Sequence, residues 1–266
     1  MRKKTASKIN KRENMPAGVA VVTVHSQVGT MVTQKRSQWL DRIGSFFALL
    51  LFAGILVGWL RLGAALTAFY LFALGGIGAA LVSGAFFVRR LRGHPLGAPG
   101  LATVAAGLAF ILAVLTSSGD GPPINDFTTD LQEPPSFAHA RTLPANLGRD
   151  MEYPKEYAAQ QTECCGDLAP QTFSTQSSET FAAAAAIAEA EPQWTVLLVN
   201  PENGTIEATA STLIFGFQDD IVVRVRPSDS GSIVDIRSKS RDGKSDLGAN
   251  AARIRSFQNK LSDQIR

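Results

Sequence analysis

Arginine and serine side chains gather near the C-terminus, where an expected strand leads through a short turn into an expected helix. Free backbone amides at a helix start, together with arginine and serine, attract anions such as phosphate or carboxylate, and Ser or Asp at that start can cap the amides. The sequence therefore offers a candidate anion-binding site formed by Arg226, Arg237, Ser238, Ser240, Arg241, Ser245, Asp246 and Asn250.

The same charges also have a structural interpretation. Arg237 and Arg241 can pair with Asp235, Asp242 or Asp246 in a solvated surface network. Such exposed pairs contribute at most about 1 kcal/mol each and need no ligand. The sequence favours this interpretation, and the anion site is its functional alternative.

Asn250 is expected on the inward face of the closing helix, between Leu247 and Ile254. A buried amide must find hydrogen-bond partners. Holding the turn at Gly243 is favoured over contact with a ligand.

An enzyme would have to use one polar cluster, formed by Ser238, Ser240, Asp246 and Asn250. The chain contains no GxSxG, HExxH or Walker-type phosphate loop. No catalytic residue is therefore predicted, and an envelope enzyme remains the alternative to a non-catalytic protein.

The metal-binding residue types are scattered. Cys164 and Cys165 are the only cysteines, and two adjacent ligands cannot close a four-coordinate zinc site. A disulfide between neighbours is uncommon and strained. His25, His94 and His139 lie in three separate segments. No metal and no cofactor is predicted.

The elements that would position the candidate residues can be read from periodicity. An alanine-rich helix is expected first, followed by four antiparallel strands and an amphipathic helix, with a hairpin turn at Asn203-Gly204. Their ranges are 178–190, 194–199, 205–214, 220–226, 232–240 and 246–265. This order predicts an α+β domain with an antiparallel sheet packed against helices.

Three apolar runs precede that domain, at 43–60, 64–88 and 96–115. A bilayer core of about 30 Å needs roughly 20 apolar residues in a helix, so the runs predict three transmembrane helices. Pro99 and several small residues in the third run leave an interfacial or re-entrant segment as its alternative. Gly75, Gly76 and Gly78 in the second run favour close helix approach, either within a hairpin or in a homodimer.

The charge distribution predicts the orientation. Residues 1–116 hold 13 Lys and Arg against 2 Asp and Glu, whereas residues 117–266 hold 13 against 21. Lys and Arg stay on the cytoplasmic side, so the N-terminus is expected inside and the C-terminal domain outside, periplasmic or extracytoplasmic. The basic residues are explained by topology and by anionic lipid, and no nucleic acid partner is predicted.

Four regions follow from these patterns. They are a basic, mostly disordered tail (1–42), a membrane region (43–116), a linker rich in Pro and Gly (117–149) and a soluble α+β domain (150–266). The linker is expected to run extended over a surface, and the family region described next begins within it.

The stretches from Ile124 to Phe137 and from Phe215 to Phe257 resemble the family catalogued as domain of unknown function 1499, through blocks such as SxSRxGxSDLGxNxxRI. The resemblance covers about residues 122–264. It implies an envelope or plastid-associated protein, and it implies no activity.

The expected function is that of a membrane-anchored envelope protein. It would act as a non-catalytic binding or structural module that contacts an anionic lipid or envelope component, or a protein partner, with the lipid bilayer as its anchor. A homodimer through the glycine-rich second span is one form of that partnership.

Overall fold

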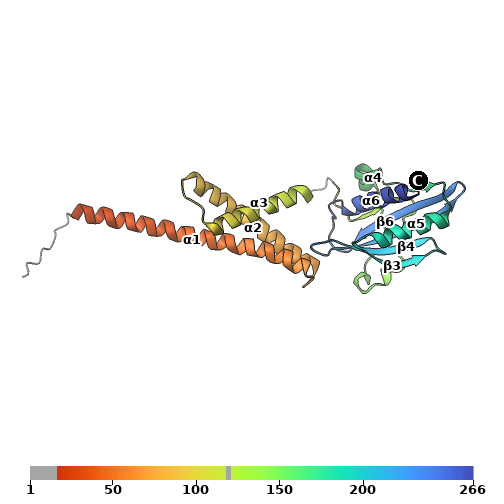
Figure 1. Ribbon diagram of the computed structural model, residues 1–266, viewed down its shortest axis with the longest axis horizontal. Helices are drawn as coiled ribbons and strands as arrows, with labels where there is room; N and C mark the ends of the chain where they lie inside the picture. Colours follow the sequence, from red (N-terminus) through yellow and green to blue (C-terminus); the bar gives the residue numbers. More distant parts are fainter. Residues whose placement is uncertain (1–16, 118–120, 266) are drawn as a thin grey trace, which may run out of the picture.

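The computed structural model describes the backbone of residues 17–117 and 121–265, and the side chains from Gln38 onward. A bundle of three long helices is followed by a separate domain at one end of the bundle (Figure 1). The helices are α1 (Ala17–Trp59), α2 (Ala65–Leu91) and α3 (Ala98–Ser117).

Each helix contains a segment long and apolar enough to cross a membrane. These segments are Gln38–Trp59, Ala65–Leu91 and Ala98–Thr116, with mean hydropathies of 1.9, 2.1 and 2.1. Pro99 does not interrupt α3, because it lies in the first turn, where a missing amide hydrogen breaks no helical bond. The three apolar helices agree with the predicted membrane anchor.

Helix α1 begins well before its apolar segment. The prediction of a mostly disordered tail through residue 42 is wrong for residues 17–42, which are helical. Once a helix is nucleated, each further residue adds a hydrogen bond, and no proline interrupts the sequence between Ala17 and Trp59. Residues 1–16 lie outside the described residues.

The glycines of α2 allow the other helices to approach closely. A Cβ atom added at Gly75 would collide with the backbone of Leu51 in α1, and one at Gly76 would collide with the ring of Phe110 in α3. These glycines therefore serve helix packing within the chain. A homodimer through the same face stays a prediction, and its partner would have to compete with α1 and α3.

The second part is an α+β domain with an antiparallel sheet, as predicted, and this sheet has six strands where four were expected. The strand order is β1-β6-β5-β4-β3, and β2 also pairs with β6. The strands are β1 (Asp126–Thr128), β2 (Gln171–Phe173), β3 (Trp194–Asn200), β4 (Thr205–Ser211), β5 (Gln218–Ser228) and β6 (Gly231–Ser240). The helices are α4 (Tyr157–Cys165), α5 (Ser177–Ala190) and α6 (Ala249–Gln264), with 3-10 turns η1 (Ala140–Thr142) and η2 (Pro144–Asn146).

Helices α5 and α6 cover one face of the sheet (Figure 1). Their apolar sides join the inward residues of the strands in the main core, which includes Phe127, Phe181, Ile221 and Phe257. The ring of Trp194 stacks on Phe257 with 5.7 Å between centroids. We call this side of the sheet the helix face.

The opposite face is covered by residues 129–155, which we call the covering segment. Phe137 and Ala140 of this segment are fully buried and cluster with Val222 of β5 and with Met151. The expectation of a linker running over the surface is therefore wrong for most of it, because β1 joins the sheet and the covering segment supplies a second small core. The domain begins before residue 150.

Candidate functional site

The sheet separates six of the eight candidate residues onto its two faces, whereas Ser245 and Asp246 lie in the turn between β6 and α6. Residues directly opposite one another in an antiparallel pair share a face. Arg237 lies opposite Val222, and Ser238 lies opposite Ile221. Arg226, Arg237 and Arg241 consequently lie on the side of the covering segment, whereas Ser238, Ser240 and Asn250 lie on the helix face. The structure does not bring the eight together as one site.

Arg237 is buried and its guanidinium is bound on all sides. Its Nε and Nη2 atoms donate to the two carboxylate oxygens of Asp126 at 2.9 and 2.8 Å. It also donates to the carbonyl oxygens of Pro135 and Met151. Lys239 Nζ donates to the same Asp126 carboxylate at 2.8 Å. This arginine has the contacts of a structural ion pair.

Two aromatic rings complete the surroundings of Arg237. Its guanidinium carbon lies 4.9 Å from the ring centre of Phe137 and 5.7 Å from that of Tyr153. Burial raises the pKa of the Tyr153 hydroxyl, and the negative charge of Asp126 raises it further, although Arg237 opposes this. The phenol is therefore held neutral beside the ion pair.

Arg241 is bound by Asp220 in the same manner. Its Nη2 and Nε atoms lie 2.6 and 3.1 Å from Asp220 Oδ1, and it also donates to Thr209 and Gln218. The covering segment reaches this carboxylate through Asn146 Nδ2 at 2.8 Å. Ion pairing of Arg237 and Arg241 was expected, but with other partners and in solvent. The observed carboxylates are buried and come from distant strands, which local sequence cannot indicate.

Arg226 is the most accessible of the candidate arginines. It shares Asp235 and Asp130 with its neighbour Arg224, at distances of 2.8 to 3.3 Å. Glu133 lies farther away, 3.7 Å from Arg226, with 75% of its side chain exposed. The Arg226 side chain is 37% exposed, against 10% for Arg241 and 1% for Arg237.

On the helix face, the serines form a closed polar network with α6. Ser238 Oγ donates to Asn250 Oδ1 at 2.5 Å, and Asn250 Nδ2 donates to Ser240 Oγ at 2.9 Å. Arg253 donates to both Ser238 and Asn250, and it pairs with Asp219 at 2.6 Å. Ser238, Ser240 and Asn250 are all buried. The network joins β6 to the first turn of α6.

Asp246 binds free amides at the start of α6, as predicted, although the N-cap residue itself is Gly248. Its carboxylate accepts hydrogen bonds from the backbone amides of Gly248 at 2.9 Å and Asn250 at 2.7 Å, and Ser245 Oγ accepts one from Leu247. Burial raises the pKa of Asp246, while these amide bonds oppose that rise. Ser245 itself is exposed.

Two details of this turn differ from expectation. Leu247 is 57% exposed and has a φ of +54°, so it does not belong to the inward face of α6, which begins at Ala249. Asn250 is linked to Gly243 through Asn125. Asn125 Nδ2 donates to the Gly243 carbonyl, and Asn250 donates to the carbonyl of Asn125.

Sequence reasoning missed the buried carboxylate of Glu207. It accepts hydrogen bonds from the backbone amides of Ala138, His139 and Ala140 at 2.7 to 2.9 Å and so holds the start of η1. The available signal was an acidic residue in the middle of the strand TIEATA. Asp126 was also missed, although it lies within the INDF stretch that carries the family resemblance.

The adjacent cysteines Cys164 and Cys165 are joined by a disulfide at the end of α4, where Cys165 faces the main core. A disulfide between neighbouring residues is uncommon, so the sequence did not predict this bond. In the part of the chain that the structure describes, no cluster of His, Cys, Asp or Glu side chains could hold a metal ion.

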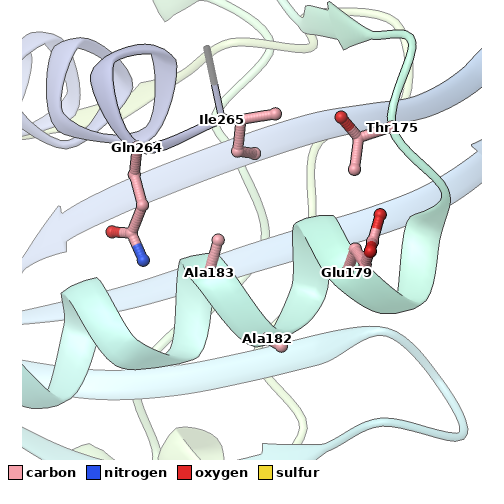
Figure 2. A pocket seen from close by; sticks show the side chains of 6 residues that line it. All are labelled: Thr175, Glu179, Ala182, Ala183, Gln264 and Ile265. Atoms are coloured by element: carbon pink, nitrogen blue, oxygen red, sulfur yellow. The ribbon is translucent and has the colours of Figure 1, made fainter.

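An open groove of about 510 Å³ lies between the segment leading into α5, α5 itself and the end of α6 (Figure 2). It is lined by Thr175, Glu179, Ala182, Ala183, Gln264 and Ile265. None of the candidate residues contributes to it, and two of its six lining residues are alanines. Glu179 is the only charged residue among those that line the groove, so the groove is not a site for binding an anion.

Comparison with known proteins gives a family and no activity. No curated protein matches the chain. A crystal structure of protein MLL2253 from Mesorhizobium loti aligns with 14% identity and a TM-score of 0.30, over 35% of this chain and 91% of that chain. The family model described as a protein of unknown function, DUF1499, matches residues 126–261. This range runs from the ion-paired Asp126 to Leu261 in α6 and covers half of the sequence, so the chain belongs to the DUF1499 family.

Proposed function

We propose that this protein is a membrane-anchored, non-catalytic module of the cell envelope that displays its α+β domain on the outer side of the membrane, periplasmic or extracytoplasmic. There the domain binds an anionic group of a lipid or envelope component through Arg226. The observation that carries the proposal is the exposure of Arg226 beside a loosely held carboxylate.

The candidate arginines differ in how easily a ligand can replace one of their carboxylate partners. Arg237 and Arg241 are fixed by buried Asp126 and Asp220. At Arg226, the outermost carboxylate is that of Glu133, at 3.7 Å and mostly in solvent. Exposed pairs of this kind contribute little to stability, so a phosphate or carboxylate of a ligand can take the place of Glu133 without disturbing Asp235 below.

The hydrogen bonds of the serine cluster support a non-catalytic role. A nucleophilic serine needs an adjacent base and access to substrate. Ser238 donates instead to an amide oxygen, and its own oxygen accepts from Arg253, in a buried position. These contacts are those of a network that fixes α6 on the sheet.

The distribution of arginines supports the outer location of the domain. Arg89, Arg90 and Arg92 follow one another where α2 ends, whereas the connection from α1 to α2 carries only Arg61. Loops rich in Lys and Arg stay in the cytoplasm. Arg61 contacts the domain through the carbonyl of Thr212, so the domain lies on the side of the less basic connection.

Ligand binding can be tested by native mass spectrometry of the full chain in neutral detergent. Phosphatidylglycerol is titrated against phosphatidylcholine, and inorganic phosphate serves as a soluble anion. We expect preferential retention of phosphatidylglycerol, weakened about tenfold in Arg226→Ala, since hydrogen bonds to a charged group contribute about 1.5–3 kcal/mol. Retention of phosphate without the lipid would indicate a soluble anion as the ligand.

Arg255→Ala is the matched control, because Arg255 is 40% exposed and is also paired with an aspartate, Asp167. It should retain the lipid as the wild type does. Equal retention by the wild type and Arg226→Ala would show that Arg226 binds no anion.

The orientation can be tested with alkaline phosphatase, which is active only outside the cytoplasm. A fusion after Arg266 should be active, and a fusion inserted at Gly93, between α2 and α3, should be inactive. The reverse pattern, with both fusions expressed, would place the domain in the cytoplasm.

A further inference from the structure

The exposed apolar side chains of the α+β domain are unevenly distributed. Among residues 121–265, the large hydrophobic residues that are exposed are Leu147, Val199, Leu213, Ile214 and Leu247. Leu213 and Leu147 are 68% and 69% exposed. All except Val199 belong to three connections at the same end of the sheet. Such clustering on a soluble surface marks an interaction site.

One of these connections, the β4–β5 loop, reaches the membrane helices. Phe215 packs its ring against Phe69 and Phe72 of α2, with centroids 5.6 and 5.3 Å apart, and Phe217 also contacts Phe69. Phe69 and Phe72 lie inside the apolar segment Ala65–Leu91. The loop therefore lies level with the first turns of a membrane-crossing helix, where Figure 1 shows the domain meeting the bundle.

Arg61 supplies hydrogen-bond donors to backbone carbonyls of this loop, which would otherwise need water. Its Nη2 atom donates to the carbonyl oxygens of Thr212 at 2.9 Å and Leu213 at 3.4 Å, and its Nη1 atom lies 3.5 Å from that of Ile214. Backbone carbonyls in contact with lipid need an internal partner. A further bond, from Phe217 N to Thr212 Oγ1, closes the loop on itself.

The contact between Arg61 and the loop is closely fitted. Arg61 has a φ of +55°, a conformation that a non-glycine residue adopts at a cost. A Cβ atom on Gly216 would collide with the Arg61 guanidinium, and one on Gly58 would lie 2.8 Å from the carbonyl oxygen of Ile214. The helix end and the loop are thus shaped to each other.

The other two connections lie at the same end of the sheet as this loop. Next to Leu147, Asn146 bonds to Asp220 near the start of β5, the strand that follows the loop. Leu247 belongs to the turn after β6, whose Asp246 amide bonds to the carbonyl of Ile124, on the segment arriving from α3. The positive φ of Leu247 places an exposed leucine where glycine or asparagine would be easier.

We propose that Leu147, Leu213, Ile214 and Leu247, which we call the apolar rim, insert into the lipid surface beside the spans. The domain then keeps one orientation on the bilayer surface and does not move freely on its connection to the helices. Leu60 and Leu62, exposed on either side of Arg61, extend the same apolar layer. The proposal rests on the membrane anchoring stated above, but neither on Arg226 nor on the side of the membrane.

Depth-dependent quenching in lipid nanodiscs tests the rim in the full chain. Both native cysteines form the disulfide, so an environment-sensitive dye will react with a single introduced cysteine. Leu213→Cys and Leu247→Cys should give blue-shifted emission that nitroxide-labelled lipids quench and aqueous iodide does not. Val199→Cys, at the other end of the sheet, should show the opposite response.

A fourth label separates this inference from the anchor itself. Leu81→Cys lies on α2 and is 73% exposed, so lipid nitroxides should quench it in any membrane-spanning arrangement. Quenching at Leu81 with iodide access at Leu213 and Leu247 would overturn the rim and leave the anchor intact. Loss of quenching at Leu81 would overturn both.

The Arg61→Ala variant tests the role of the guanidinium. Removing it leaves loop carbonyls without their donor, so the dye at Leu213 should become accessible to iodide. Arg92→Ala, in the connection at the other end of α2, should leave the dye protected. An unchanged response in Arg61→Ala would show that the loop does not depend on Arg61.

Discussion

Asp126 and Arg237 are separated by 111 residues and form a bidentate ion pair in which both side chains are buried. The pair joins β1, from the segment expected as a linker, to β6 in the centre of the domain. Lys239 shares the carboxylate. Folding of the sheet is therefore tied to residues that directly follow the membrane helices.

Truncation of this pair should destabilise the domain strongly. Arg237→Ala is expected to cost about 3–5 kcal/mol, because it leaves the buried Asp126 carboxylate with one partner fewer. Urea unfolding of the full chain in detergent, followed by near-ultraviolet circular dichroism, measures the change. Arg141→Ala removes an exposed pair with Glu152 and should cost less than about 1 kcal/mol. Equal losses in the two variants would show that burial adds nothing to the pair.

Tyr153 should make the domain sensitive to alkali. Its pKa in the folded state is raised above the ordinary value of 10.0 by burial and by Asp126. Above pH 10 the unfolded chain loses this proton while the folded chain keeps it, so the free energy of unfolding falls as the pH rises. Tyr153→Phe should remove that fall, measured by urea unfolding at several alkaline pH values. A fall that persists in Tyr153→Phe would assign it to another group.

Local periodicity was enough to predict the larger elements. The alternation from Asp220 to Arg226 and the apolar spacing from Ile254 to Ile265 correspond to β5 and α6. The three-residue strands β1 and β2 have no period to detect, and each exists because β6 offers an edge to it. Pairing over such distances depends on the assembled sheet, which a short sequence window does not contain.

The candidate site was predicted less well for a related reason. The alternation that predicts β6 already places Arg237 and Ser238 on opposite faces, and a single site cannot readily include both. The ion-pair partners of Arg237 and Arg241 could not be predicted from local sequence, because Asp126 and Asp220 come from other strands. Aspartate side chains are usually exposed to solvent, so the residue type alone does not predict burial. Their burial here depends on arginines that only the fold brings to them.

Glu207 should control the order of the covering segment. Glu207→Gln keeps the size but replaces one carboxylate oxygen, so at least one of the amides of Ala138, His139 and Ala140 loses its acceptor. An unsatisfied buried donor costs about 1–3 kcal/mol. Hydrogen–deuterium exchange should therefore accelerate around η1. Glu202→Gln, in the exposed β3–β4 turn, should leave exchange unchanged, and so should Glu207→Gln if its carboxylate does not hold the segment.

Gly75 should determine how closely α1 and α2 pack. Gly75→Ala places a methyl group against the backbone of Leu51, which cannot move aside as a flexible side chain would, so the helices must separate. Overpacking of this kind costs about 1–3 kcal/mol. The thermal midpoint of the full chain in detergent should fall, as followed by helical circular dichroism. Gly84→Ala in the same helix meets nothing within 4 Å and should leave the midpoint unchanged or raise it slightly, since alanine favours helix over glycine. A Gly75→Ala variant as stable as Gly84→Ala would mean that α1 and α2 do not meet at this glycine in solution.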